Sequence, residues 1–225
     1  MTAQIIKLNF INKSKDKNER TVVIFQKNIA EKIDKTAVAW TVIKNPRFHV
    51  QYSFLYPLRF KIRASDPYGN LSRTITACNG QSFEMITDNA GYTLRLSNTP
   101  ATSKTEVEIK NSLGAGKING YALKNEKVLA TKTNIAPKQK ASFQFRPTIW
   151  VGIVPKIIEE GGIMNSAITR SINREIPLEN ITRADIVMTG GGSCKTSSPF
   201  IFSLEKRWWS KHDLHSFHFQ PRKRE

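Results

Sequence analysis

The segment of residues 184–196, ADIVMTGGGSCKT, has the residue types of a phosphate-binding loop. An apolar strand pattern leads into three glycines and then into a Lys-Thr pair. Such a loop holds phosphate with its amides only where a glycine directly precedes the lysine and a helix begins there. Here Cys194 takes that glycine position, and Ser197, Ser198 and Pro199 lead into a second strand pattern. The spacing therefore favours an ordinary glycine connection over a nucleotide site.

Cys194 is also a candidate nucleophile, because the cation of Lys195 beside it favours the thiolate. A general base would have to be His212 or His215. A nucleophile and its base must lie within hydrogen-bond reach, and no pattern in the sequence brings these residues together. We therefore expect a free cysteine in a loop and assign no catalytic residue.

Three of the four histidines lie at intervals of three residues: His212, His215 and His218. On a helix they would share a face and could bind a divalent metal ion. No carboxylate or cysteine completes a structural set of ligands, so we assign no physiological metal site. The surrounding residues 205–225 are basic and aromatic, which is typical of segments that insert at a lipid interface or stack on bases. We expect this segment to be a C-terminal extension with little order.

The remaining ionisable residues have structural roles available to them. His49 falls on the polar side of an alternating stretch, residues 48–54, with no cysteine or carboxylate at ligand spacing. Asp66, Asp88 and Asp185 each stand at a turn or at the end of a strand pattern. No spacing argues for a pair of general acids. The sequence thus indicates no catalytic residue, no cofactor and no metal.

Residues 141–154, ASFQFRPTIWVGIV, show best how the chain is built. Their first half alternates apolar and polar side chains, which predicts a strand with one buried face. Their second half is almost entirely apolar and suits a strand covered on both sides. Pro147 cannot donate to a sheet and marks the bend between the two strands.

Turn signals elsewhere recur about every ten residues, which is typical of a β-sandwich or barrel. Asn79-Gly80 is the best candidate for a two-residue hairpin turn. Residues 163–172 fit either a strand or one or two helical turns. We predict an all-β fold: a single, mostly antiparallel β-sandwich of about ten or more strands with little helix, made of residues 1–204 and followed by the extension 205–225.

The amino-acid composition limits the classes of protein to which the chain can belong. With 39% hydrophobic and 24% charged residues, the 225-residue chain is typical of a soluble globular protein. Its apolar runs are shorter than the roughly 20 residues that cross a bilayer, and its start lacks the pattern of a secretory signal. Two cysteines make no disulfide framework, which favours a reducing compartment. We expect a cytoplasmic protein, or one released without a classical signal peptide.

The formal net charge of +17 is the unusual global property. It attracts nucleic acids, anionic membrane surfaces and acidic partners. The lysines and arginines are spread over the whole length, and no nucleic-acid-binding motif accompanies them. We therefore expect nucleic acid to bind only through non-specific charge attraction.

Several short apolar pieces resemble the rhizosphere-induced protein family of soil bacteria. They are VVIFQ (22–26), AVAW (37–40), YSFLY (52–56), FRPTIWVGI (145–153) and EGGIMNSAI (160–168). The resemblance implies a bacterial all-β protein without an agreed catalytic mechanism, and it transfers no functional residue. The chain departs from the family at Tyr56, where a tryptophan is common, and in its basic tail.

These observations predict a non-enzymatic binding or self-associating protein of unknown ligand. We expect recognition at the loops of residues 65–70, 88–92 and 190–197, because binding residues collect on loops held by a rigid sandwich. The partner would be a protein, a glycan or a lipid surface, and a homo-oligomer is compatible with this function. Two alternatives stay open: a charge-driven protein of membrane surfaces or of the pore-forming type, and a hydrolase or oxygenase on a jelly-roll scaffold.

Overall fold

The computed structural model describes residues 4–30, 36–154, 158–172, 174–192 and 198–206. These residues form eighteen strands and one short helix, α1 (Ser166–Ser171). The predicted all-β fold with little helix is confirmed. Most strand pairs are antiparallel, also as predicted.

Two sheets built from both ends of the chain form what we call the host sandwich. Its strands are β1 (Ile5–Asn12), β2 (Thr21–Phe25), β4 (Thr41–Lys44), β5 (Gln51–Pro57), β14 (Thr148–Val154), β16 (Glu175–Pro177), β17 (Arg183–Thr189) and β18 (Ile201–Lys206). One sheet has the order β18-β17-β1-β5, and the other has the order β16-β14-β2-β4. The parallel pair β1 and β17 joins the two ends of the chain.

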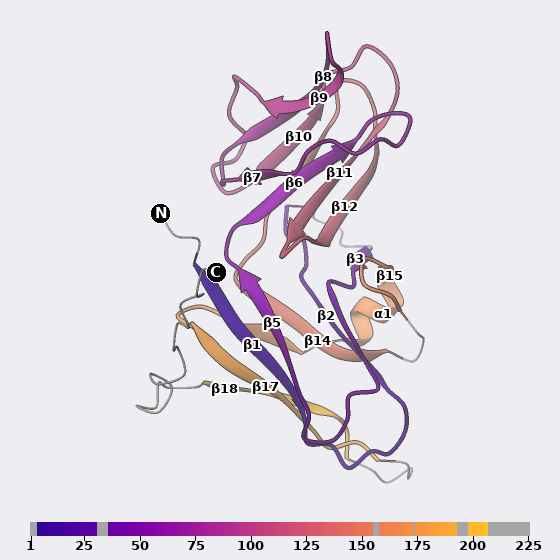
Figure 1. Ribbon diagram of the computed structural model, residues 1–225, viewed down its shortest axis with the longest axis vertical. Helices are drawn as coiled ribbons and strands as arrows, with labels where there is room; N and C mark the ends of the chain where they lie inside the picture. The colour runs from indigo at the N-terminus through magenta and orange to yellow at the C-terminus, as the bar shows by residue number, and fades with distance from the viewer. Residues whose placement is uncertain (1–3, 31–35, 155–157, 173, 193–197, 207–225) are drawn as a thin grey trace, which may run out of the picture.

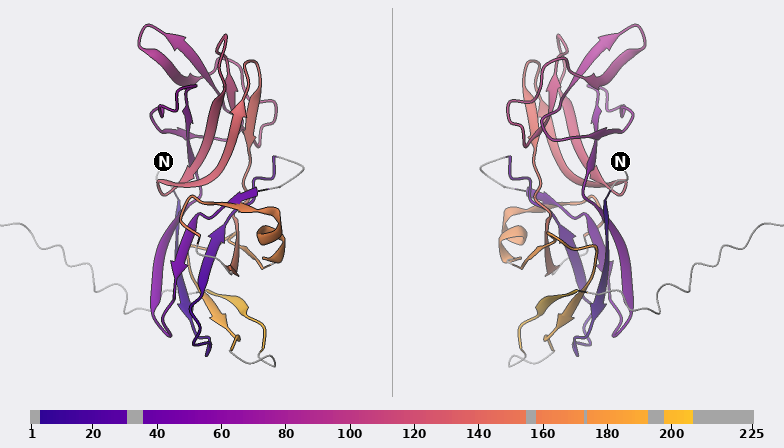
Figure 2. Two further views of the ribbon diagram at one scale, coloured as in Figure 1. Left: turned by 90° about the vertical axis from the view of Figure 1, so that its right-hand side faces the viewer. Right: turned by 90° about the vertical axis from the view of Figure 1, so that its left-hand side faces the viewer.

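The middle of the chain forms a second pair of sheets, which we call the inserted sandwich. Its strands are β6 (Phe60–Ser65), β7 (Ile75–Ala77), β8 (Ser82–Asp88), β9 (Gly91–Leu96), β10 (Val107–Asn111), β11 (Ile118–Lys124), β12 (Lys127–Ile135) and β13 (Lys140–Phe143). The sheet orders are β12-β11-β6-β7 and β13-β10-β8-β9. Figures 1 and 2 show the inserted sandwich stacked on one end of the host sandwich, so that the molecule is elongated.

Each sandwich has its own hydrophobic core. Ile6, Leu8 and Phe10 of β1 point into the host core, where Ile24 and Val151 come from the facing sheet. A separate cluster, with Phe83, Ile109 and Phe143 among its members, fills the inserted sandwich. The alternation in residues 141–146 and the apolar run after Pro147 therefore belong to strands of different sandwiches, and Pro147 lies at the crossing between them. The sheets are more numerous than the two facing sheets that the alternation suggests, and the assignment of residues 1–204 to one domain stays a prediction.

Strand β14 is covered on both faces, as its apolar run predicts. Its outer side packs under α1 and the small sheet of β3 (Thr36–Val38) and β15 (Ile163–Asn165). Gly152 makes this close packing feasible, because a Cβ atom there would lie 2.7 Å from the side chain of Ile172. The ambiguous residues 163–172 thus form a short strand followed by one short helix, whose first turn is capped by the side chain of Asn165.

The junction of the two sandwiches buries a lysine. Lys124, at the end of β11, is 2% exposed, and its Nζ atom lies 3.7 Å from the centroid of the Tyr56 ring. The Trp40 indole packs edge-on against the same ring and donates a hydrogen bond of 3.0 Å from Nε1 to the Lys124 carbonyl. Burial lowers the pKa of Lys124 to about 7. The ammonium is thus held by a ring face instead of a carboxylate.

Two local predictions are wrong. Asn79-Gly80 does not close a hairpin, because β7 and β8 belong to different sheets and the turn links one face of the inserted sandwich to the other. The alternating strand also begins later than residue 48. Phe48 and His49 lie in the preceding loop, where the left-handed backbone of His49, with φ of 60°, interrupts the alternation.

Candidate functional site: a loop cavity at the free end of the host sandwich

Three loops that are far apart in the sequence meet where β1 ends, at the end of the host sandwich away from the inserted one. They follow β1, β4 and β17, and they line a cavity of about 370 Å³. The lining combines apolar side chains, those of Pro46, Phe48, Met188 and Phe200, with polar and charged ones: Asn12, Ser14, Asp16, Lys17, Asn18, Glu19, Arg20, Asn45 and Arg47. Such a half-open hollow with converging polar groups is the usual form of a ligand site.

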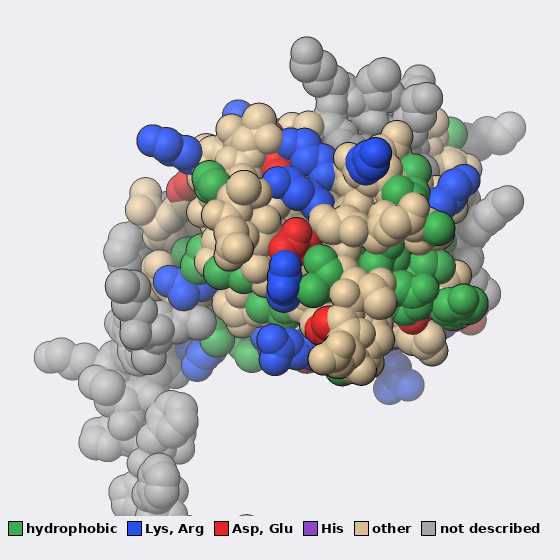
Figure 3. Space-filling view, turned by 90° about the horizontal axis from the view of Figure 1, so that it is seen from above, with side chains coloured by type: hydrophobic (Ala, Val, Ile, Leu, Met, Phe, Trp, Pro, Cys, Tyr) green, Lys and Arg blue, Asp and Glu red, His purple; other side chains and the backbone are tan. Residues whose placement is uncertain are grey.

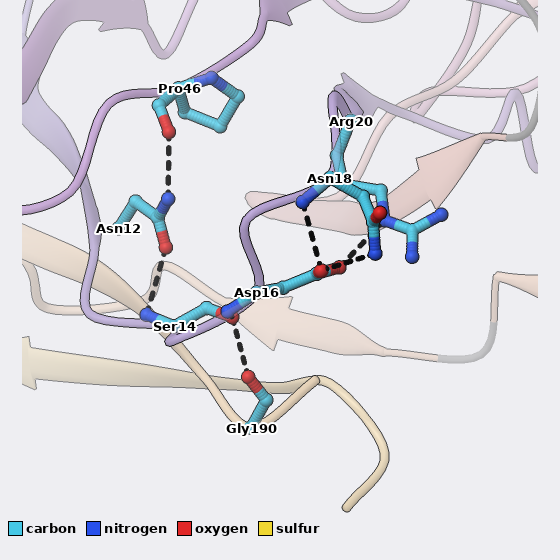
Figure 4. A network of polar contacts seen from close by, with 7 residues as sticks. All are labelled: Asn12, Ser14, Asp16, Asn18, Arg20, Pro46 and Gly190. Atoms are coloured by element: carbon cyan, nitrogen blue, oxygen red, sulfur yellow. Dashed lines mark hydrogen bonds and ion pairs between the residues drawn. The ribbon is translucent and has the colours of Figure 1, made fainter. Parts of the chain in front are cut away.

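Asn12, the last residue of β1, ties the first two loops together (Figure 4). It is 6% exposed. Its amide Nδ2 donates to the carbonyl of Pro46 at 2.7 Å, and its Oδ1 accepts from the Ser14 amide at 2.8 Å. Its own carbonyl accepts from the backbone amide of His49 at 2.7 Å. One buried side chain thus fixes the spacing of both loops.

Ser14 connects the third loop. Its Oγ donates to the carbonyl of Gly190 at 2.5 Å, as Figure 4 shows. Gly190 and Gly191 have φ angles of 73° and 71°, and added Cβ atoms would lie 2.1 Å from Pro199 and Phe200. These glycines are therefore required for the return of the chain into β18. The strand after them supports the interpretation of the run as a glycine connection.

Asp16 closes the first loop on itself. Its carboxylate accepts from the Asn18 amide at 3.0 Å and from Arg20 Nε at 2.7 Å. Burial alone would raise the pKa of Asp16, but the hydrogen bonds from Asn18 and Arg20 and the guanidinium charge outweigh it and lower that pKa. At neutral pH this carboxylate is ionised and fully engaged, so it holds the loop and does not serve as a proton donor.

The lining of the cavity also includes cations and aromatic rings. Among the residues that the structure describes, Lys17 and Arg47 have no carboxylate partner. Phe48 is 56% exposed, with its ring stacked on His49 at a centroid distance of 4.1 Å. The Arg20 guanidinium lies 5.7 Å from the centroid of the Phe200 ring. Glu19 is the second carboxylate of the lining, so with Asp16 paired to Arg20 the remaining charges, Lys17 and Arg47 against Glu19, sum to one positive charge beside apolar ring faces.

The backbone of the second loop is held in a sparsely populated conformation. Asn45 and His49, on either side of residues 46–48, both have positive φ, at 46° and 60°. Such angles persist only where surrounding contacts impose them. Here the bonds from Asn12 to Pro46 and from His49 to Asn12 supply those contacts. The loop is therefore shaped before any ligand arrives.

The candidate site residues of the sequence analysis lie in several separate parts of the structure. The side chains of Asp66 and Asp88 accept hydrogen bonds from backbone amides in turns, as expected. Asp185 lies inside β17 and accepts from Asn9 Nδ2 at 2.7 Å, so its predicted strand-end role is wrong. Cys194, Lys195 and the three histidines of the tail lie outside the described residues. Within the described ranges, no three His, Cys, Asp or Glu side chains gather as metal ligands.

The three predicted recognition loops divide between the two ends of the molecule. Of the loop of residues 190–197 the structure describes only the glycines 190–192, and the Gly190 carbonyl accepts a hydrogen bond from Ser14, which lines the loop cavity. The loops of residues 65–70 and 88–92 meet instead on the inserted sandwich, where the rings of Tyr68 and Tyr92 lie 6.1 Å apart. Asn12 and Ser14 were not identified from sequence, because no motif marks an asparagine or a serine that joins distant loops.

Comparison with protein-family models, with curated proteins and with solved structures finds no match for this chain. The resemblance to the rhizosphere-induced protein family therefore stays a prediction. In the described part of the chain, no helix combines the length and apolar character needed to cross a membrane.

Proposed function

We propose that the protein is a non-enzymatic binding protein whose loop cavity takes an anionic group of its ligand. The observation that carries this proposal is the clamp of Asn12 and Ser14, which holds three distant loops around one hollow. Lys17 and Arg47 line that hollow, where they outnumber the single further carboxylate, Glu19. A preformed site with cations on its wall favours an anion, because little ordering is needed on binding.

The aromatic rings beside these cations restrict further the kinds of ligand that fit the cavity. Phe48 and Phe200 give the cavity an apolar side next to its charges. A ligand that carries a phosphate-like group on a ring or on an aliphatic body would satisfy both parts. Two sources share this chemistry: a free phosphorylated sugar and the head group of an anionic lipid. The second source corresponds to the membrane-surface alternative.

Arg47→Gln tests the site. We expect the affinity for glucose 6-phosphate to fall roughly tenfold or more, because a charge-assisted hydrogen bond contributes about 1.5–3 kcal/mol. Isothermal titration at near-physiological salt, where the Debye length is about 8 Å, limits attraction by the overall charge. The matched control is Lys117→Gln, the same loss of charge at an exposed site on the inserted sandwich.

The two sources are separated by a second arm. Co-sedimentation with phosphatidylcholine vesicles, with and without phosphatidylglycerol, shows whether a lipid head group binds better than the free phosphate. Loss of binding in Arg47→Gln alone, in either arm, supports the cavity. An equal loss in both variants would mean that only the net charge attracts the anion, and the proposal would fail.

A further inference from the structure

We propose a second binding site, for a neutral carbohydrate, at the tyrosine pair formed by Tyr68 and Tyr92 on the inserted sandwich. This site is independent of the loop cavity and lies at the opposite end of the molecule. Tyr68 is 81% exposed, more than any other large hydrophobic side chain in the described part of the chain. An aromatic ring so poorly buried forgoes folding energy and is typical of contact surfaces.

The loop that carries Tyr68 is held together by hydrogen bonds. Oδ1 of Asp66 accepts hydrogen bonds from the backbone amides of Tyr68 at 2.9 Å and Asn70 at 2.8 Å. Its Oδ2 accepts a hydrogen bond from Asn70 Nδ2 at 2.9 Å. Gly69, with φ of 91°, donates to the Asp66 carbonyl. Burial alone would raise the pKa of Asp66, but the side-chain and backbone hydrogen bonds lower it, so the loop keeps this acceptor at neutral pH.

A second element fixes the loop from outside. Pro67 packs against the backbone of Gly116, where a Cβ atom would lie 2.5 Å from the proline ring. The backbone of Tyr92 is also held in place, because this residue lies at the start of β9, directly after the hairpin turn that Asp88 caps. Both rings therefore project from preformed backbone, and a tyrosine side chain has only two torsions to order on binding.

The two rings together make a platform. Their centroids are 6.1 Å apart and their planes are inclined by 40°, with Tyr92 38% exposed. Figure 3 looks down on this end of the molecule and shows hydrophobic side chains gathered toward the right, the side on which Figure 1 places the loop after β6. The electron-rich faces of aromatic rings attract partly positive C–H groups. One face of a pyranose ring presents such groups.

The local charge selects a neutral ligand. In a protein with a net charge of +17, the loops of residues 65–70 and 88–92 contain no lysine or arginine, and they contain two aspartates. Nucleic acids and anionic membranes require cations at the contact, which these loops lack. A neutral sugar needs only ring faces and polar groups around them. The phenol hydroxyls and the exposed Asn70 and Asp88 can supply hydrogen bonds to its hydroxyls.

The test uses the full-length protein and a panel of neutral oligosaccharides: maltotriose, cellotriose and mannotriose. Saturation-transfer NMR and isothermal titration measure binding, and a single-stranded thymidine oligonucleotide is the charged competitor. We expect at least one trisaccharide to bind, and Tyr68→Ala to weaken its binding at least about tenfold, because the sugar loses the more exposed of the two ring faces. Tyr68→Phe keeps the ring and should stay within about threefold of the wild type.

The control is Phe48→Ala, which removes a comparably exposed ring from the loop cavity and should leave trisaccharide binding unchanged. Because Phe48 lines the other site, failure of the carbohydrate proposal and failure of the anion proposal give different results. The carbohydrate proposal is overturned if no trisaccharide binds, if the oligonucleotide displaces the sugar, or if Phe48→Ala weakens binding as much as Tyr68→Ala. It is also overturned if Tyr68→Ala dissociates an oligomer in sedimentation, since the ring would then contact protein.

Discussion

At pH 10 the protein is expected to be more stable toward unfolding than at pH 7 by about 3 kcal/mol, and Lys124→Met is expected to lose most of this difference. Burial holds the pKa of Lys124 at about 7 in the folded protein, whereas its ordinary value is 10.5. Between these values the unfolded chain binds one more proton than the folded chain. Stability therefore rises with pH in this window, by at most about 1.4 kcal/mol per pH unit.

The increase of stability with pH ends near pH 10 because of Tyr56, whose ring contacts the Lys124 ammonium. Burial raises the pKa of Tyr56 above its ordinary value of 10.0, and the charge of Glu179 adds to this, although a hydrogen bond from Gln26 opposes it. Above pH 10 the unfolded chain loses the phenol proton and the folded chain keeps it. Stability then falls as the pH increases further.

Urea unfolding followed by tryptophan fluorescence at several pH values measures this effect. Methionine fills a similar volume without a charge, so Lys124→Met should also be more stable than the wild type at pH 7, by about 2 kcal/mol after the loss of the cation–π contact. Lys117→Met removes an exposed lysine and should keep the wild-type dependence on pH. An unchanged slope in Lys124→Met would show that the buried ammonium does not cause it.

The second large effect is expected at Asn12. Asn12→Ala should lower the free energy of unfolding by about 2–4 kcal/mol, because it leaves the buried Pro46 carbonyl and the Ser14 amide without their partner. Hydrogen exchange should rise in the loops of residues 13–20 and 45–50. The strands of the inserted sandwich should keep their protection, since their core is separate.

Asn18→Ala is the matched control for Asn12→Ala. Asn18 is exposed, and within the described ranges of the chain it bonds only to Asp16 of its own loop. We expect its removal to cost less than about 1 kcal/mol and to leave the loop of residues 45–50 protected. Equal losses in the two variants would contradict the role of Asn12 as the link between loops.

The sequence predicts the strands well because burial leaves a local pattern. Residues 149–154 are apolar on both faces, and the structure covers β14 from both sides. The pairing of strands leaves no such pattern. The turn at Asn79-Gly80 has the residues of a hairpin, yet it joins two sheets, because any tight turn with positive φ suits Asn-Gly.

The two candidate sites are predictable only in part, because contacts between distant strands and loops leave no local pattern in the sequence. Turn residues marked the loops of residues 65–70 and 88–92, but their meeting depends on the facing of two sheets. Lys124 belongs to the sequence Lys-Asn-Glu-Lys, which has the composition of an exposed turn. Its burial results from the stacking of one sandwich on the other, and no periodicity within the chain records that contact.

The parallel pairing of β1 with β17 has a consequence for synthesis. Asn9 and its partner Asp185 are 176 residues apart, and the whole inserted sandwich lies between them. At the usual rates of translation, β1 waits roughly 10–35 s for its neighbour to leave the ribosome. During that interval the middle of the nascent chain can already fold, while the apolar side chains of Ile6, Leu8 and Phe10 still lack their final cover. We expect chaperones that recognise emerging chains to bind this N-terminal strand.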